Sequence, residues 1–442
     1  MTRGRIVRLK LRKAQRDRLR ALQFIVTEAA KYVPFYRDAF LRANVKAEDL
    51  RDIEDLRRYP ITKKSDLLSS GREGHLHAGV KEKALTRRST TGTQGTPITV
   101  FSSQGESLFR KATLLDSFRR LSRLQIPLSI ADVGVEQGKI GSDWVQKLRL
   151  VTVERIFRSY PIAEQVERMR RFSPALVEGR PSSLWMLATS ARLQGVQLPK
   201  PRLVVSFGEV LYPHVRELLH EVFGSRVADF YNCEEVGNVA WECPHHPECM
   251  HVNPATTILE VVDENGKNAQ QGQVGSVLLT NLYNRTMPFI RYDIGDRAEI
   301  SEGADCSCGF TGQSIHLVEG RDEDFFCLPD GRKMSPRNAY EAVAGVLPFK
   351  ELGNDLFQVM HGFQIVQELP DLISVNVIPG PSYTADIWRG VEASAQTLHP
   401  AIRTCVRVVE KLELAPGGKF KAVMSRVETS TPFEDESPLP NA

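Results

Sequence analysis

The sequence predicts an α/β protein: a large N-terminal domain of sheets flanked by helices, joined by a hinge to a smaller α+β C-terminal domain. Between residues 175 and 231, short apolar runs that fit buried strands alternate with amphipathic stretches that fit helices, which is typical of parallel sheets with covered faces. Beyond residue 325, the pattern changes to a few short strands and one helix-like stretch. The length of 442 residues agrees with more than one domain, because ordinary domains have roughly 100 to 200 residues.

The N-terminal part of the chain is predicted to be helical. A long helix should end near Tyr32, because the residue before Pro34 is biased away from helical backbone. Residues 1–20 carry nine Lys and Arg against one acid, Asp17. Such a segment could contact nucleic acid or an anionic membrane. A solvated helix explains it more simply, and we expect no nucleic-acid partner.

Three predicted strands and two predicted helices follow one another in the alternating region. The strands are "ALVEG", "PRLVVSFGE" and "RVADFYN", and the helices are "PSSLWMLATSARLQG" and "YPHVRELLHEVFG". In the second helix Pro213 suits the first turn and Gly224 suits the C-terminal cap. The loops "SFGEV" and "FYNCEEVG" lie at the carboxyl ends of strands, where ligands usually bind in such sheets.

Later segments define the domain boundaries. "TTILEVV" and "VLLTNL" are predicted as two strands around a polar turn, and "RYDIGDRAEI" follows them. We place the large domain at residues 1–320, the small domain at 321–428, and a disordered tail rich in Pro, Ser and acidic residues at 429–442. The hinge is predicted at residues 321–324.

The chain has no run of 18 apolar residues and no signal-peptide pattern. Its seven cysteines are an odd number, which argues against a disulfide framework in a chain of this size. We therefore expect a cytoplasmic protein without integral membrane association.

Two segments rich in cysteine and histidine, "ECPHHPECMHV" and "CSCG", suggest a metal site. Four thiolate or imidazole ligands would close a structural, tetrahedral Zn²⁺ site. Free thiols are the alternative.

The stretch "TTGTQGTP" lies between a predicted strand and the strand "ITVFSS". Its hydroxyls and glycine amides could hold a polyanion. It lacks the Gly-Lys-Ser/Thr ending of a Walker-type loop, so a flexible turn fits the stretch equally well.

The order of several segments carries more information than any one of them. "TTGTQGTP", "FYNCEE", "RYDIGD", "EGRDED" and "APGGKFKAV" resemble, in the same order, the signature segments of the adenylate-forming superfamily of acyl-CoA synthetases and adenylation domains. "VPFYRD", "MPFIRYDIGD" and "CSCG" look most like its phenylacetate-CoA ligase branch. The resemblance spans residues 32–427. It implies that ATP and Mg²⁺ activate a carboxylic acid, an aryl acid rather than a fatty acid, as an acyl-adenylate that is passed to CoA.

The resemblance also implies roles for individual residues. The threonine and glycine loop would donate hydrogen bonds to the β and γ phosphates of ATP, although Gln94 stands where relatives often have a second Ser or Thr, and no Lys follows Pro97. The loop residues that match the pattern are Thr91, Gly92, Thr93, Gly95 and Thr96.

The other segments supply the remaining nucleotide contacts. Tyr231 would stack on adenine and Glu235 would hold Mg²⁺, with Asn232 replacing a glycine, and with Glu234 replacing a Ser or Thr that usually touches the α-phosphate. Alternatively, the acidic pair 234–235 could simply begin a helix. Asp296 would bind both ribose hydroxyls and Arg321 would approach the ribose, although the aspartates of "DIGD" could instead form a turn.

In the small domain, Glu323 matches the hinge position and Lys419 the mobile catalytic lysine, with Lys421 as its competitor. The zinc ligands of the branch fit Cys243, His251, Cys306 and Cys308, with Cys249 competing for the second place. Residues flanking the nucleotide loops could line the acyl pocket: Phe207, Gly208, Glu209 and Trp241, of which Gly208 and Glu209 are also expected to contact the nucleotide. Similar proteins are commonly dimers, so a homodimer is an open alternative.

Three other functions remain open. An amine or hydroxyl could replace CoA as the acceptor, giving an amide or ester. A zinc hydrolase built on the Cys/His cluster would need an open metal position. A degenerate, non-catalytic homologue is suggested by Gln94, Asn232 and Glu234.

Overall fold

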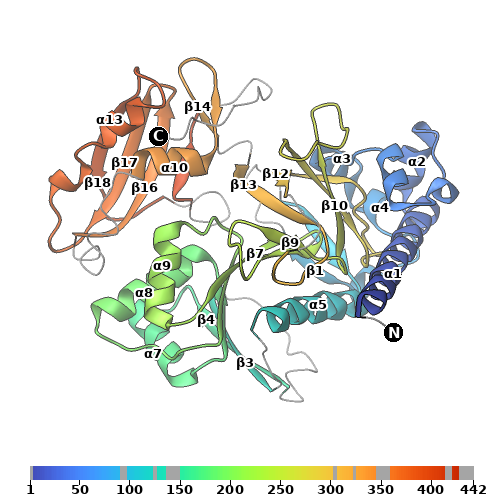
Figure 1. The fold of residues 1–442 in the computed structure, drawn as a ribbon, viewed down its shortest axis with the longest axis horizontal. Helices are drawn as coiled ribbons and strands as arrows, with labels where there is room; N and C mark the ends of the chain where they lie inside the picture. The colour runs from blue at the N-terminus through green and yellow to red at the C-terminus, as the bar shows by residue number, and fades with distance from the viewer. Residues whose placement is uncertain are drawn as a thin grey trace.

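The computed structural model describes residues 3–89, 97–122, 127–135, 150–301, 306–321, 325–344, 359–413 and 421–427. Figure 1 shows a large body that contains the main sheet and a smaller body, in orange and red, that lies beside helices α8 (Pro181–Leu193) and α9 (Pro213–Phe223). The predicted fold class is confirmed. The boundaries at residues 320 and 428 stay predictions, and the tail 429–442 lies outside the described residues.

One sheet of 11 strands organises the large body within the described ranges, in the order β10-β11-β12-β13-β9-β8-β7-β6-β5-β3-β4. The half from β4 to β7 is parallel, and the half from β7 to β10 is antiparallel. The strands are β3 Leu128–Val135, β4 Val151–Phe157, β5 Leu176–Gly179, β6 Leu203–Phe207, β7 Val227–Cys233, β8 Gly237–Glu242, β9 Met250–Val252, β10 Thr257–Val262, β11 Val274–Asn281, β12 Tyr292–Ile300 and β13 Ser314–Arg321.

Helices cover both faces of the parallel half. On one face, α7 (Ile162–Phe172), α8 (Pro181–Leu193) and α9 (Pro213–Phe223) bury one apolar cluster with the sheet. On the other face, α5 (Gln104–Ser122) packs through Phe118 on a second cluster that includes Leu128, Leu176 and Leu203. Side chains alternate between the two clusters along each strand, as the two-residue period of a strand requires. The predicted strands and helices of residues 175–231 are confirmed, and Gly224 caps α9 at φ 58°.

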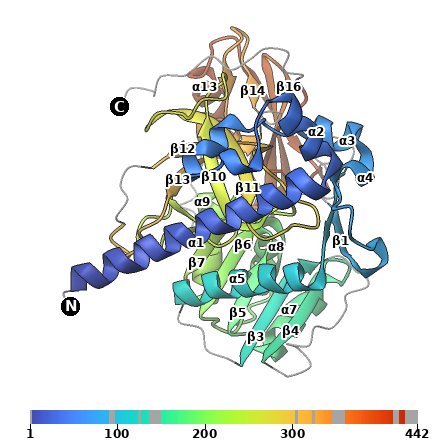
Figure 2. The ribbon, with the colours of Figure 1, turned by 90° about the vertical axis from the view of Figure 1, so that its right-hand side faces the viewer.

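One long helix and several short ones pack around the antiparallel half of the sheet. In Figure 2 the long helix α1 (Arg3–Tyr32) crosses strands β10 and β11, and Leu22, Ile25 and Val26 pack in one buried cluster with Ile258 of β10. The other elements of this region are α2 Pro34–Arg42, η1 Ala47–Asp49, η2 Ile53–Arg58, α3 Lys64–Ser69, α4 Gly71–His75, η3 Glu82–Ala84, and the antiparallel pair β1 Thr86–Ser89 and β2 Thr99–Ser102. The predicted helix end at Tyr32 is confirmed.

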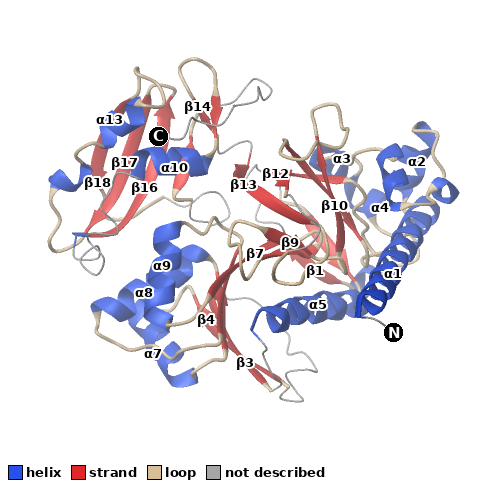
Figure 3. Cartoon of the chain, in the orientation of Figure 1, coloured by secondary structure: helices blue, strands red, loops and turns tan. Residues whose placement is uncertain are grey.

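The small body is a mixed sheet in the order β18-β17-β16-β19 with helices on one side, as Figure 3 shows. Its elements are β14 Phe326–Cys327, β15 Lys333–Met334, α10 Pro336–Ala344, β16 Met360–Leu369, β17 Leu372–Pro379, η6 Ala385–Trp388, α13 Val391–Gln396, β18 Arg403–Val408 and β19 Val423–Ser425. These strands and helices match the α+β class that the sequence predicts for this part of the chain.

The small body packs on α8 and α9 of the large one. The hydroxyl of Tyr340 in α10 lies 2.5 Å from Nδ1 of His214 in α9. The indole of Trp185 in α8 reaches Gly362 of β16 so closely that a Cβ there would lie 2.8 Å from it. A glycine is therefore required at residue 362 for this contact. No helix within the described ranges combines the length and apolar character that crossing a membrane requires.

Candidate active site

A cleft of about 570 Å³ opens where the parallel and antiparallel halves of the sheet meet. It is lined at the carboxyl ends of strands, which is the expected place for a ligand in such a sheet. Its lining residues are Lys63, Lys64, Ser65, Ser89, Ile98, Arg110, Leu114, Asp132, Glu178, Arg180, Phe207, Gly208, Asn232, Cys233, Glu234, Glu235, Gly237, Asn238, Tyr292, Asp293, Ile294, Gly295 and Asp296.

The predicted phosphate loop begins and ends at this cleft. Strands β1 and β2 pair antiparallel from Thr86↔Ser102 to Ser89↔Thr99, and Ser89 and Ile98 both line the cleft. The structure confirms the two strands that were predicted on either side of the stretch. The candidate residues Thr91, Gly92, Thr93, Gly95 and Thr96 lie outside the described residues.

The turn from β7 to β8 brings Glu235 to the cleft. Its side chain is buried, and its carbonyl oxygen accepts a hydrogen bond from Nδ2 of Asn281 at 3.2 Å. Gly237 has φ 92°, and a Cβ at this residue would lie 3.1 Å from Arg110, so only glycine fits the turn. Because the chain enters β8 directly, the alternative that residues 234–235 begin a helix is wrong.

Glu234, which replaces a hydroxyl residue of the superfamily pattern, is held by two arginines. Nη2 of Arg110 lies 3.0 Å from its carboxylate, and Nη1 of Arg110 donates to its carbonyl oxygen at 2.6 Å. Nε of Arg88, in β1 next to the phosphate loop, lies 3.7 Å from the same carboxylate. Two guanidinium groups therefore lie at Glu234 on the edge of the cleft, where they can attract phosphate oxygens.

A bulge in β12 directs Asp296 toward Tyr231. Residues Asp293 and Arg297 pair with Leu278 and Ser276 of β11, so three residues of β12 face one residue of β11 between these pairs. The hydroxyl of Tyr231 donates to Oδ2 of Asp296 at 2.6 Å. Asp293 accepts from the Gly295 amide at 3.0 Å and so has the turn-forming role that was left open for it. The bulge thus places one aspartate in the turn and the other beside a tyrosine.

Asn232 also lines the cleft, and its Oδ1 accepts from Asn238 at 2.9 Å. Phe207, the last residue of β6, and Gly208, which follows it, line the cleft as well. Glu209 is not among the lining residues, and its carboxylate accepts from the Ser182 amide at the start of α8. Trp241 is buried in β8 against Phe310 and lies outside the lining set.

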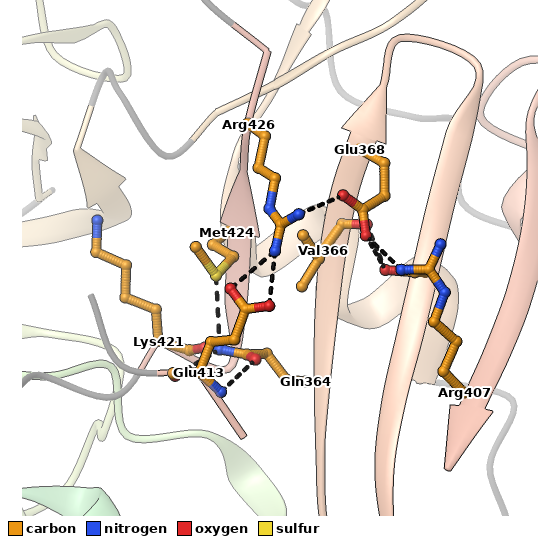
Figure 4. Close-up of polar contacts among 9 residues, drawn as sticks. Gln364, Val366, Glu368, Arg407, Glu413, Lys421, Met424 and Arg426 are labelled. Atoms are coloured by element: carbon orange, nitrogen blue, oxygen red, sulfur yellow. Dashed lines mark hydrogen bonds and ion pairs between the residues drawn. The ribbon is translucent and has the colours of Figure 1, made fainter. Parts of the chain in front are cut away.

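The predicted catalytic segment of the small domain is described only at its two ends. Lys419 and the hinge residue Glu323 lie outside the described residues, and Arg321 ends β13 with its backbone opposite Asp296. The amide of Gln364 in β16 donates to the carbonyl oxygens of Glu413, at 3.0 Å, and Lys421, at 2.8 Å. Figure 4 shows this contact and the Lys421 side chain, which extends away from the ion pairs of Arg426.

The four predicted zinc ligands lie together. Their ligand atoms are all within 4.8 Å of one another: Cys243, His251, Cys306 and Cys308. His251 Nε2 faces Cys308 Sγ at 3.2 Å, and its Nδ1 lies 2.9 Å from the Ser314 hydroxyl, which orients the ring. Burial lowers the pKa of His251 to about 4, so the imidazole is neutral, as a metal ligand must be. Cys249 stands apart, with Sγ 3.9 Å from Ser301.

The lining residues that the sequence analysis did not name include Arg110, Asp132, Glu178 and Arg180. Arg88 was also missed; it does not line the cleft but lies 3.7 Å from Glu234, which does. The repeated arginine just before the threonine and glycine loop was a usable signal for Arg88. A charged residue inside the otherwise apolar strands "LSIADVGV" and "ALVEG" was a usable signal for Asp132 and Glu178.

Comparison with known proteins shows what the whole chain is similar to. No family model matches the chain. The chain is 28% identical over 328 residues to a phenylacetate-coenzyme A ligase of Thermus thermophilus, covering 73% of this chain and 72% of the relative. It is 23% identical over 353 residues to a phenylacetate-coenzyme A ligase of Pseudomonas putida, covering 77% of each chain. A crystal structure of 2-hydroxyisobutyryl-CoA ligase in the postadenylation state matches with a TM-score of 0.74 at 20% identity, covering 93% of this chain and 89% of that one.

Proposed function

We propose, from the premise that this chain is a phenylacetate-CoA ligase-like member of the adenylate-forming superfamily, that it is an AMP-forming acid–CoA ligase. In the first half-reaction, a carboxylate oxygen of the acid bonds to the α-phosphorus of ATP, and the bond to pyrophosphate breaks. In the second, the thiol of CoA gives up its proton and bonds to the acyl carbon, and AMP leaves with the bonding electrons. The products are an acyl-CoA thioester, AMP and pyrophosphate.

The observation that carries this proposal is the single cleft shared by the matched nucleotide segments. Glu235, Asp296 and the two ends of the phosphate loop line one cavity, although they lie far apart in the sequence. In the proposed complex, Asp296 accepts from the ribose hydroxyls, and the loop with Arg88 and Arg110 attracts the phosphates. Tyr231 lies beside Asp296, where its ring can stack on adenine.

Glu235 is the proposed ligand for Mg²⁺, which neutralises phosphate charge when bound. Glu235 lies in the turn between β7 and β8. Arg110 and Asn281 bond the backbone carbonyls of Glu234 and Glu235, and these contacts fix the position of the turn. The superfamily resemblance further assigns Arg321 to the ribose, and Gly208 and Glu209 to the nucleotide side of the cleft.

The small domain is proposed to supply the mobile catalytic group. Lys419 would contact the substrate carboxylate and the α-phosphate, and rotation at Glu323 would then admit CoA. A lysine suits this role because it places a compact charge on a long stem. The contact of Tyr340 with His214 supports this view, since it is an interdomain contact that a rotation would break.

The four-residue Cys/His cluster is proposed to hold a structural Zn²⁺ ion. Two loops distant in the sequence would be joined by four protein ligands, which close a tetrahedral shell. This arrangement offers no open position for water, so it does not support a zinc hydrolase. An aryl acid as substrate, a cytoplasmic location and a homodimer remain predictions.

Acid-dependent exchange of pyrophosphate into ATP tests the proposed function. We expect exchange with at least one acid in a panel of aryl, fatty and amino-substituted acids, and thioester formation when CoA is added. Lys419→Ala should abolish exchange, whereas Lys421→Ala should retain it; retained melting temperatures would exclude unfolding. Absence of exchange with every acid would contradict adenylation, and amide or ester formation without thioester would identify another acceptor.

A further inference from the structure

Three charged residues form a row across neighbouring strands of the parallel half. Asp132 of β3 is in register with Arg155 of β4 on one side and with Glu178 of β5 on the other. Side chains at paired positions of adjacent strands project from the same face of a sheet. The row therefore places two carboxyl groups side by side with a single guanidinium at one end.

This row continues the apolar face that α5 covers. Leu128 and Ile130 precede Asp132 at two-residue intervals in β3, and Leu176 precedes Glu178 in β5. These apolar residues pack in one buried cluster with Phe118 of α5. At the next position toward the carboxyl ends of the strands, each apolar series is replaced by an acid, and both acids line the cleft.

Within the described part of the chain, the two carboxyl groups are only weakly compensated. Among the residues that the structure describes, neither accepts a hydrogen bond or lies within 4.0 Å of a cationic nitrogen, although Arg155 acts on both at longer range. Burial raises the pKa of each carboxyl, and the charge of Asp132 raises that of Glu178 further. Because the pKa of Glu178 is raised to about 8, this acid is protonated at neutral pH, and a cation bound beside the row would allow both acids to ionise.

Charge decides which part of the reactants can meet this row. ATP, pyrophosphate and the reacting carboxylate are all anions, which buried carboxylates repel. The proposed function assigns the adenine and ribose of ATP to Tyr231 and Asp296, which leaves the unreactive part of the acid to meet this row. It would be bound best if it carried a positive charge and hydrogen-bond donors, which would satisfy both carboxyls at once.

We propose that Asp132 and Glu178 bind an ammonium group on the acid substrate, so that the enzyme selects carboxylic acids that also carry an amine. This inference rests on the proposed function and specifies its substrate class. Leu114 of α5 and Phe207 at the end of β6 line the same cleft and can contact the carbon skeleton between the ammonium and carboxylate groups. Asp132 and Glu178 are thus residues that determine specificity.

Acids that differ only by an ammonium in place of a methyl group test the proposal. The pairs are 4-(aminomethyl)benzoate with 4-ethylbenzoate, and 5-aminopentanoate with hexanoate. We expect kcat/KM for pyrophosphate exchange to favour the ammonium member of at least one pair by about tenfold or more, as a charged hydrogen bond would give. The double variant Asp132→Asn, Glu178→Gln should lose or invert this preference.

Two controls keep the outcomes separate. Removing two acids whose charged forms are disfavoured by burial should not lower the melting temperature, so unfolding would not explain a lost preference. Glu164→Gln, on the exposed side of α7, should leave the preference unchanged. Preference for the methyl member in both pairs, or an ammonium preference that survives in the double variant, would overturn the proposal. If no acid supports exchange, the proposed function fails, and calorimetric binding of the same pairs to the intact protein decides whether the cleft prefers an ammonium.

Discussion

The hydroxyl of Tyr340 lies 2.5 Å from Nδ1 of His214, and this contact joins the small domain to helix α9 of the large one. The Tyr340 ring also stacks on Tyr212 with ring centroids 4.4 Å apart. Phe363 extends the aromatic group from β16. A contact of this kind exists in one orientation of the small domain and is lost in any other.

Tyr340→Phe should therefore affect the two half-reactions unequally. The ring stays stacked while the hydrogen bond is lost, which removes about 1 kcal/mol from this orientation, or about fivefold in an equilibrium. We expect the half-reaction that uses this orientation to slow by about that factor, while the other does not slow. Single-turnover measurement of adenylate formation and of thioester formation separates them. Tyr383→Phe, elsewhere in the small domain, is the matched control. Equal slowing of both steps would contradict a role in domain orientation.

His214 should make stability depend on pH. Burial lowers its pKa in the folded protein to about 4, so the folded state holds a neutral ring, while the unfolded chain binds a proton below its usual pKa near 6.5. Because the unfolded state then binds more protons, stability falls as pH drops from about 6.5 toward 4, by up to about 1.4 kcal/mol per pH unit. Urea unfolding at several pH values should show a shallower fall in His214→Gln. An unchanged slope would show that this histidine does not titrate on unfolding.

Gln364 holds both ends of the segment that contains Lys419. Its buried amide bonds the backbone of Glu413 on one side and of Lys421 on the other. Gln364→Met keeps the volume but removes these bonds, so we expect adenylate formation to drop by about tenfold or more because the lysine is less well positioned. Gln367→Met is a close control, since Gln367 is equally buried in β16 but bonds the backbone of Cys327. If both variants lose activity and stability alike, the role of Gln364 is only structural.

Zinc content should distinguish the cluster ligands from their neighbour. Cys308→Ser should lower bound zinc, measured by atomic emission on the purified chain, and should lower the melting temperature because structural zinc contributes folding free energy. Cys249→Ser should keep one zinc per chain, since its sulfur stands outside the cluster. Equal zinc content in wild type and Cys308→Ser would argue against the assignment.

The sequence was sufficient for features that depend on neighbouring residues or on an ordered set of motifs. Pro213 and Gly224 marked the ends of α9, because both act through local backbone preferences. The four candidate zinc ligands were found through a resemblance, and the structure brings them together. The hypothesis that residues 234–235 begin a helix was wrong. Acidic residues are favoured in the first turn of a helix, but this preference does not exclude a turn between two strands at the same place.

Other features depend on contacts between distant residues and were therefore missed. Arg110 bonds a carbonyl 124 residues away, and nothing in the local pattern around it indicates that partner. Asp132 and Glu178 become a pair only because β3 and β5 are neighbours, although 46 positions separate the two residues and β4 lies between them in the sequence. Sequence periodicity reports which face a residue occupies, but it does not report which strands are adjacent.

The charged row across β4, β3 and β5 has a consequence for how such an enzyme could be altered. Its three positions are spaced by backbone hydrogen bonds rather than by loop conformation. Exchanging one side chain in each strand would therefore change the chemistry at this place while leaving its geometry intact. A small library at residues 132, 155 and 178 is a direct route to enzymes that activate different acids on the same scaffold.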